Sequence, residues 1–188
     1  MTLLVASLSR TALAALVLCG FALSPAPAAA ASKEELDAHV HQAIQDLYRS
    51  NVVAKELAGK AAGVLVFPDV IKAGFWVGGQ YGQSALLVGQ SIVGHYNIVG
   101  ASFGLQAGVQ DESVAIMFMT AEALNKFRES KGWKIGVDGS VAVVTVGVGG
   151  VIDSETLRKP IIAFVFNNKG LMASLALEGS KITKIEKK

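Results

Sequence analysis

The chain has 188 residues, of which 52% are hydrophobic and 17% charged, and its formal net charge is +2. This near-neutral balance excludes a nucleic-acid binder of the kind that relies on clustered excess positive charge. Residues 32–188, which remain after the leader described next, are enough for one domain with a single core.

Residues 1–31 are predicted to be a secretory signal peptide. One basic residue, Arg10, precedes the apolar run T-A-L-A-A-L-V-L, and small residues follow it with an A-x-A site ending at Ala30 or Ala31. A transmembrane helix needs about 20 apolar residues, and Pro25 and Pro27 interrupt this segment too early. We therefore expect an exported protein, periplasmic or associated with the outer membrane.

Cys19, the only cysteine, leaves a second interpretation of the leader open. It stands in L-V-L-C-G, where a bacterial lipoprotein would carry its acylated cysteine, but Leu18 occupies the place of the usual small residue. Cleavage near Ala31 is favoured, and the mature chain then has no thiol and no disulfide. In the alternative, an acylated Cys19 tethers the domain to a membrane.

Two helices are predicted at the start of the domain. Ser32 and Glu35 have the spacing of a capping box, and a helix to about Arg49 carries one apolar stripe. That stripe consists of Leu36, Val40, Ala43, Ile44 and Leu47. Ser50 and Asn51 can cap a second, short helix that continues to Lys60.

From Gly63 onward, short apolar runs rich in branched and aromatic residues predict strands, with Pro68 ending one of them. A helix over Ala121–Ser130, capped by Thr120, interrupts them. Strands then return, and N-N-K-G at 167–170 predicts a tight hairpin turn. The basic tail 181–188 is interpreted as a solvated end. The fold class expected is α+β, with N-terminal helices on a mainly antiparallel, glycine-rich sheet, as one sheet or two stacked sheets.

Ser102 lies in G-A-S-F-G, a match to the nucleophile elbow G-x-S-x-G. An elbow needs a helix after the serine, but L-Q-A-G-V-Q continues as an alternating strand. The alternation puts Ala101 on a buried face and Gly100 on a small, polar one. All three histidines precede Ser102, against the order of that hydrolase fold. A strand is therefore predicted here, and a serine hydrolase that acts through Ser102 is the least favoured of the functions considered.

The remaining chemistry-bearing residues predict neither a metal site nor a bound cofactor. His39 and His41 are two apart on a helix and point to different faces, and His95 is interpreted as structural. Asp111 and Glu112 are expected in a polar loop. Two sets of glycines four apart indicate tight packing of a curved sheet or, alternatively, a surface open to a ligand or membrane. They are Gly74, Gly78 and Gly82, and Gly100, Gly104 and Gly108.

Four blocks in order resemble the SYLF domain, a lipid-binding family. They are A-A-G-V-L-V-F-P-D-V-I-K-A-G-F-W-V-G-G-Q-Y-G, G-A-S-F-G-L-Q-A-G-V-Q, G-W-K-I-G-V-D-G-S-V-A-V and K-G-L-M-A-S-L-A-L-E-G-S-K-I. The blocks lie between Ala61 and Ile182, and the resemblance is taken to extend from about Ser32 to Ile185, with the closest match to bacterial, exported, stand-alone members. The resemblance implies a single, non-enzymatic SYLF domain over residues 32–188 that binds phospholipid head groups. Yeast members also bind actin, which export would separate from this protein.

The first hypothesis is therefore a phospholipid-binding protein of the bacterial cell envelope. The site expected for it contains Lys55, Lys60 and Lys72, with Phe75 and Trp76 supplying apolar contact. Residues 32–60 carry a net charge of minus one, so attraction to an anionic surface depends on such a local cluster. The alternative is an envelope scaffold that binds a protein partner through its glycine-rich sheet or an exposed edge.

Overall fold

The computed structural model describes the backbone of residues 32–147, 152–167, 177 and 179–187. It describes their side chains except at 74–77 and 102–110. The leader with Cys19, residues 168–170 of the expected hairpin turn and most of the strand expected before Ser180 lie outside the described residues. The side chains of Phe75 and Trp76 lie outside them as well.

Three α-helices form where the sequence predicts them. Helix α2 spans Lys33–Ser50, α3 spans Val52–Ala58 and α4 spans Ala121–Glu129. Each begins at its expected cap, because the side chains of Ser32, Asn51 and Thr120 accept hydrogen bonds from backbone N–H groups three residues on. The five stripe residues of α2 are all buried.

Two long strands dominate the sheet. Strand β1 spans Gly63–Val88, β2 spans Ser91–Phe118, and they pair as one antiparallel hairpin. The prediction that Pro68 ends a strand is wrong, because the pairing resumes after a bulge between Phe67 and Val70. The bulge inserts an extra residue into β1, which accommodates a proline that cannot donate a ladder hydrogen bond.

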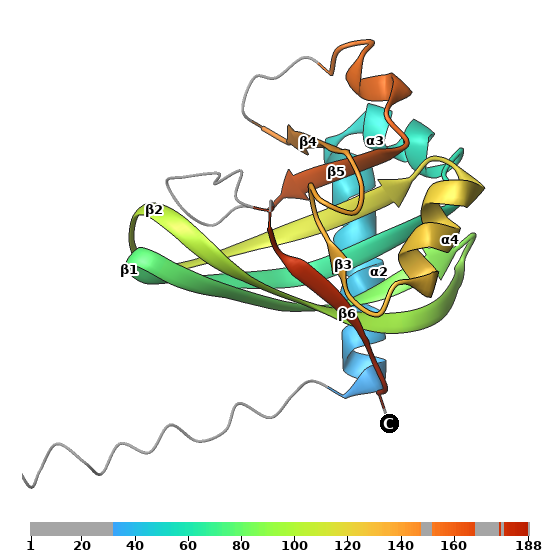
Figure 1. Cartoon of the computed structure of the whole chain (residues 1–188). Helices are drawn as coiled ribbons and strands as arrows, with labels where there is room; N and C mark the ends of the chain where they lie inside the picture. The colour runs from blue at the N-terminus through green and yellow to red at the C-terminus, as the bar shows by residue number, and fades with distance from the viewer. Residues whose placement is uncertain (1–31, 148–151, 168–176, 178, 188) are drawn as a thin grey trace, which may run out of the picture. The chain divides into compact units, whose positions relative to one another are not determined.

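Strand β1 curls until its two halves lie against each other (Figure 1). A Cβ atom at Gly82 would lie 2.7 Å from the backbone oxygen of Asp69, and one at Gly63 would lie 3.3 Å from that of Leu87. Real Cβ atoms do not approach a backbone oxygen as closely as at Gly82, so this position requires glycine. The packing interpretation of the glycine pattern therefore holds at Gly82.

Four further strands complete the sheet in the described part of the chain. They are β3 (Trp133–Lys134), β4 (Val141–Thr145), β5 (Ile161–Phe166) and β6 (Lys181–Ile185), and a short 3₁₀ helix η2 spans Thr156–Arg158. Strand β2 pairs with β1 on one edge and with β6 and β5 on the other. Among these described strands, β4 and β5 are the parallel pair.

The fold class is α+β with a mostly antiparallel sheet, as predicted, and the described strands join one curled sheet rather than two stacked ones. The interpretation of the basic tail as a solvated end is wrong. Residues Lys181–Ile185 pair with both β2 and β3, and Ile182 is fully buried. Ile182 and Ile185 are three positions apart and therefore face opposite sides of the strand, and Ile182 is the buried one of the two.

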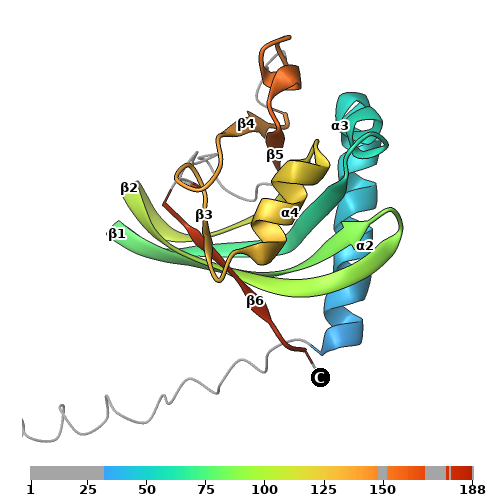
Figure 2. The same ribbon diagram turned by 45° about the vertical axis from the view of Figure 1, so that its right-hand side comes forward.

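The two faces of the sheet carry separate hydrophobic clusters. The inner face of the curl packs against α4, whose Phe127 stacks on Phe118 and meets Trp133 edge to face. The outer face packs against α2 and α3 (Figure 2). Neighbouring residues of one strand divide between the clusters: Leu65 lies in the inner one and Val66 in the outer one.

Candidate functional site

Lys72 and Glu112 form an ion pair inside the curl of the sheet. Lys72 Nζ lies 2.7 Å from Glu112 Oε1, and the exposed fractions of the side chains are 0% and 1%. Burial raises the pKa of the Glu112 carboxyl above its usual value, and the neighbouring ammonium offsets part of that rise. Lys72, one of the predicted lipid-binding residues, is therefore enclosed in the protein and does not reach the surface.

The prediction that Asp111 and Glu112 occupy a loop is wrong, because both lie within β2 opposite Ile71 and Val70. Two adjacent carboxylates are typical of a polar turn, but here Glu112 lies on the inner face with Val114. A buried lysine on the paired strand makes that position tolerable for a carboxylate. The pairing partner was not visible in the local sequence.

Gly100 and Ala101 lie on the reverse of the faces predicted for them. Ala101 is exposed, whereas Gly100 faces inward against Gln80 and Ser180, whose side chains hydrogen-bond to each other. A Cβ atom at Gly100 would collide with this pair. Position 100 therefore requires glycine, because the side chains of Gln80 and Ser180 approach the backbone closely there. Counting apolar residues on each face of the strand could not reveal this contact.

Ser102 lies within β2, where its backbone pairs with Gly78. The strand continues to Phe118 without the turn into a helix that an elbow requires. The strand prediction is confirmed. The side chain of Ser102 lies outside the described residues.

His95 occupies the position expected of a structural residue. His95 is buried, with Nε2 2.7 Å from Oδ1 of Asp37, and this contact links β2 to α2. His39 and His41 lie on opposite flanks of α2, as predicted. Within the described residues, no group of three or more His, Cys, Asp or Glu side chains is placed to hold a metal ion.

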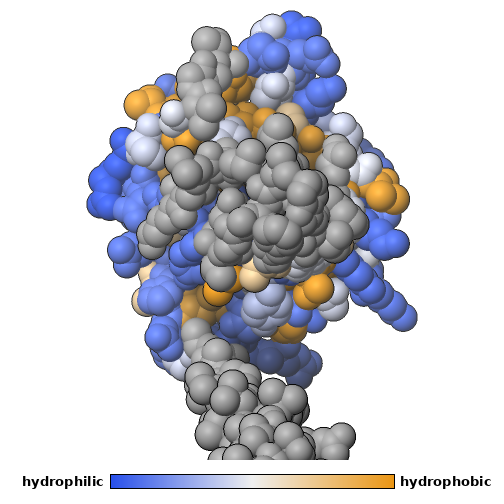
Figure 3. Space-filling model, turned by 90° about the vertical axis from the view of Figure 1, so that its left-hand side faces the viewer, coloured by the Kyte–Doolittle hydropathy of each residue, from blue (hydrophilic) through white to orange (hydrophobic). Residues whose placement is uncertain are grey.

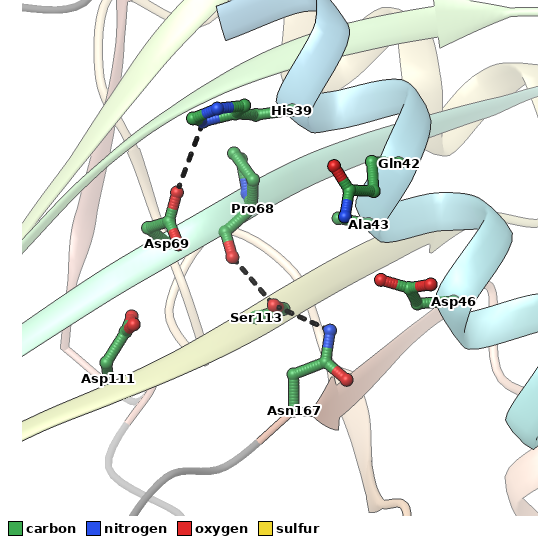
Figure 4. Close-up of a pocket in the computed structure, with 9 residues that line it drawn as sticks. All are labelled: His39, Gln42, Ala43, Asp46, Pro68, Asp69, Asp111, Ser113 and Asn167. Atoms are coloured by element: carbon green, nitrogen blue, oxygen red, sulfur yellow. Dashed lines mark hydrogen bonds and ion pairs between the residues drawn. The ribbon is translucent and has the colours of Figure 1, made fainter.

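One flank of α2 borders an acidic groove of about 580 Å³ (Figure 4). Its lining includes Asp46 of α2, Asp69 at the bulge of β1 and Asp111 of β2. His39 Nδ1 lies 3.8 Å from Asp69 Oδ2, while the hydroxyl of Ser113 donates to the backbone oxygen of Pro68. The described lining has no lysine or arginine, so this groove repels an anionic ligand.

The other flank of α2 borders a second groove of about 580 Å³, which we call the apolar groove. Ile44 of α2 and Val64 and Leu87 of β1 contribute apolar surface, and the polar groups come from His41, Gln45, Tyr48, Lys55 and Gln90. The described residues that line it include no aspartate or glutamate. Lys55 was predicted as a site residue, but Ile44, Tyr48 and Leu87 were not. Ile44 and Tyr48 are one turn apart on α2, a spacing that could have indicated a shared flank.

The structure brings together two of the five predicted site residues. Lys55 on α3 and Lys60 just after it are both exposed, and Val52 and Val53 at the start of α3 are exposed by 68% and 37%. In the coloured part of the face in Figure 3, hydrophobic residues lie in small separate areas. Such scattered exposure is ordinary, so the notable feature of α3 is that its exposed valines adjoin lysines.

Comparison with known protein families adds to this geometry. Residues 99–188 match the Ysc84 family, described as "Las17-binding protein actin regulator". This is the SYLF family that the sequence resembles, and the match covers the C-terminal part of the chain. A comparison with curated proteins gives no match. None of the helices in the described residues has the length and apolarity needed to cross a bilayer.

Proposed function

We propose that this protein binds anionic phospholipid at the surface of a bacterial envelope membrane, after export directed by residues 1–31. The contacting element is the α3 end of the domain, which consists of α3 and the turn through Lys60. The observation that carries the proposal is the grouping of exposed Val52 and Val53 with exposed Lys55 and Lys60.

The chemistry of the α3 end suits weak, reversible attachment. Each lysine close to an anionic membrane contributes about 1 kcal/mol, and a half-inserted valine adds a hydrophobic contribution of similar size. Glu56 on the same helix opposes the lysines, so binding depends on low salt and on a high fraction of anionic lipid.

Co-sedimentation with vesicles tests the proposal. We expect the purified protein to sediment with phosphatidylglycerol or cardiolipin vesicles at low salt and to stay in solution with phosphatidylcholine vesicles. Added salt should release it. Failure to sediment with either anionic vesicle at low salt would contradict the proposal.

A protein partner remains the second candidate function. Tyr81 and Val99 are directly opposed on β1 and β2, and they are exposed by 47% and 52%. An exposed aromatic beside a branched side chain is a common anchor of protein interfaces. A stoichiometric partner recovered from envelope extracts by the wild type but not by Tyr81→Ser, without any binding to vesicles, would favour this function.

A further inference from the structure

The apolar groove differs from the exposed α3 surface because it is hollow. It is bounded by α2, by α3 with the residues after it, and by the turn between β1 and β2. Small residues line much of it, and a Cβ atom at Gly89 would meet nothing within 4 Å. Ile44, Val64 and Leu87 lie at its bottom, each less than 9% exposed. A flat bilayer surface cannot reach those side chains.

The positive charge of Lys55 favours an anionic ligand in the apolar groove. Lys55 is the one charged residue among the described residues that line it, and its ammonium can meet a single anionic group at the edge. Tyr48 also lines the groove, and its hydroxyl, whose pKa is raised by burial, can donate a hydrogen bond to a head group. Apolar surface below and one cation above suit an amphiphile with one chain and one negative charge.

We propose that the apolar groove binds a single-chain anionic lipid, such as a fatty acid anion, as a monomer. The chain lies over Ile44, Val64 and Leu87, and the head group lies at Lys55. The inference deepens the proposed function and rests on it in assigning lipid to this end of α2. The two proposals differ in the state of the lipid. The groove binds a single lipid molecule that has left the bilayer, whereas the α3 end contacts lipids that remain in it.

Calorimetric titration of the purified protein with decanoate, below its critical micelle concentration, tests the inference. Decyltrimethylammonium has the same chain length and the opposite charge, and serves as the ligand control. We expect saturable binding of decanoate and much weaker binding of the cation. From octanoate to dodecanoate, affinity should rise about fourfold for each methylene that enters the groove.

Variants separate the groove from the membrane surface. Lys55→Gln should weaken decanoate binding about fivefold, the loss of one charge-assisted contact. Lys33→Gln should leave it unchanged, since Lys33 lies at the start of α2 and does not line the groove. Ala58→Leu narrows the groove and should reduce binding, whereas Ala121→Leu, at an exposed position of α4, is the matched control for an added leucine. Circular dichroism confirms that each variant is folded.

The outcomes distinguish this inference from the proposed function. Decanoate binding with Lys55 dependence but no vesicle binding would support the groove and overturn the membrane surface. Vesicle binding with no saturable decanoate binding, or with equal binding of anion and cation, would overturn the groove alone. An Ala58→Leu variant that is folded and binds decanoate like the wild type would also overturn it.

Discussion

Lysines on the inner and outer sides of the curled sheet lie in opposite environments. Inside the curl, Lys72 is enclosed with Glu112 at 2.7 Å. On the outside, Lys55 is exposed at the edge of a groove whose described lining has no acidic residue. The inner ammonium is buried in an ion pair, whereas the outer ammonium is exposed and can be reached by a ligand. Two lysines of similar appearance in the sequence therefore lie in different environments, one buried in an ion pair and one exposed, and we propose a binding role for the exposed one alone.

Lys72→Met should have the largest effect of the changes considered, a loss of about 3–5 kcal/mol in the free energy of unfolding. It leaves the buried Glu112 carboxylate without its cation. The double variant Lys72→Met, Glu112→Leu removes both charges and should recover most of that loss. Urea denaturation measures both. If the single variant lost less than about 1 kcal/mol, or the double variant were no better, the ion pair would have no such role in stability.

Gly82→Ala should lower the free energy of unfolding by about 1–3 kcal/mol, because the new Cβ atom collides with the backbone oxygen of Asp69 and forces the two halves of β1 apart. Gly79→Ala on the same strand is the matched control. Its Cβ atom would meet only the oxygen of Gly100, at an ordinary 3.9 Å. Equal stability of the two variants would contradict the close approach of the two halves at Gly82.

Lys55→Gln and Lys60→Gln should each weaken binding to anionic vesicles by about 1 kcal/mol, or about fivefold. Lys33→Gln is the matched control. Lys33 is exposed at the far end of α2, which is about 27 Å long. Vesicle sedimentation over a lipid titration measures the change. An equal loss from Lys33→Gln would indicate a general charge effect rather than a contact made by the α3 end.

Glu112→Gln should remove a pH dependence of stability, the smallest of these effects. Because the pKa of Glu112 is raised in the folded state, the folded protein holds more protons than the unfolded one between the usual and the raised pKa. Stability from this group is present below that window and is lost as pH rises through it. Urea denaturation across this pH range should give a flatter profile for Glu112→Gln. If the free energy of unfolding of Glu112→Gln changed with pH as steeply as that of the wild type, another group would cause the pH dependence.

The sequence predicted those parts of the fold that depend on local patterns. Caps and an apolar stripe located α2, α3 and α4, and the change of period located the sheet. The continuity of the strands was harder to predict. Pro68 interrupts the strand pattern in the sequence, but a bulge accommodates the proline and the pairing continues beyond it. The strand at Lys181–Ile185 was missed because its lysines are typical of a charged end, whereas the pairing partners that make it a strand are distant in sequence.

The candidate site was predictable only in part, for a related reason. The exposure of Lys55 and Lys60 follows from their place on a short amphipathic helix and the turn after it. The burial of Lys72 depends on Glu112, which is 40 positions away in the sequence and comes close only through strand register. The apolar groove combines residues of α2, α3 and the β1–β2 turn. No local pattern contains that combination.

The central claim is that the α3 end of the domain contacts an anionic membrane. Its most direct test is an environment-sensitive fluorophore on a single cysteine introduced at Val53, in a Cys19→Ala background. We expect a blue shift on adding phosphatidylglycerol vesicles, and no shift for the same probe at Ala38, an exposed position on α2. A shift at Ala38 without one at Val53, or no shift at either position, would contradict the claim.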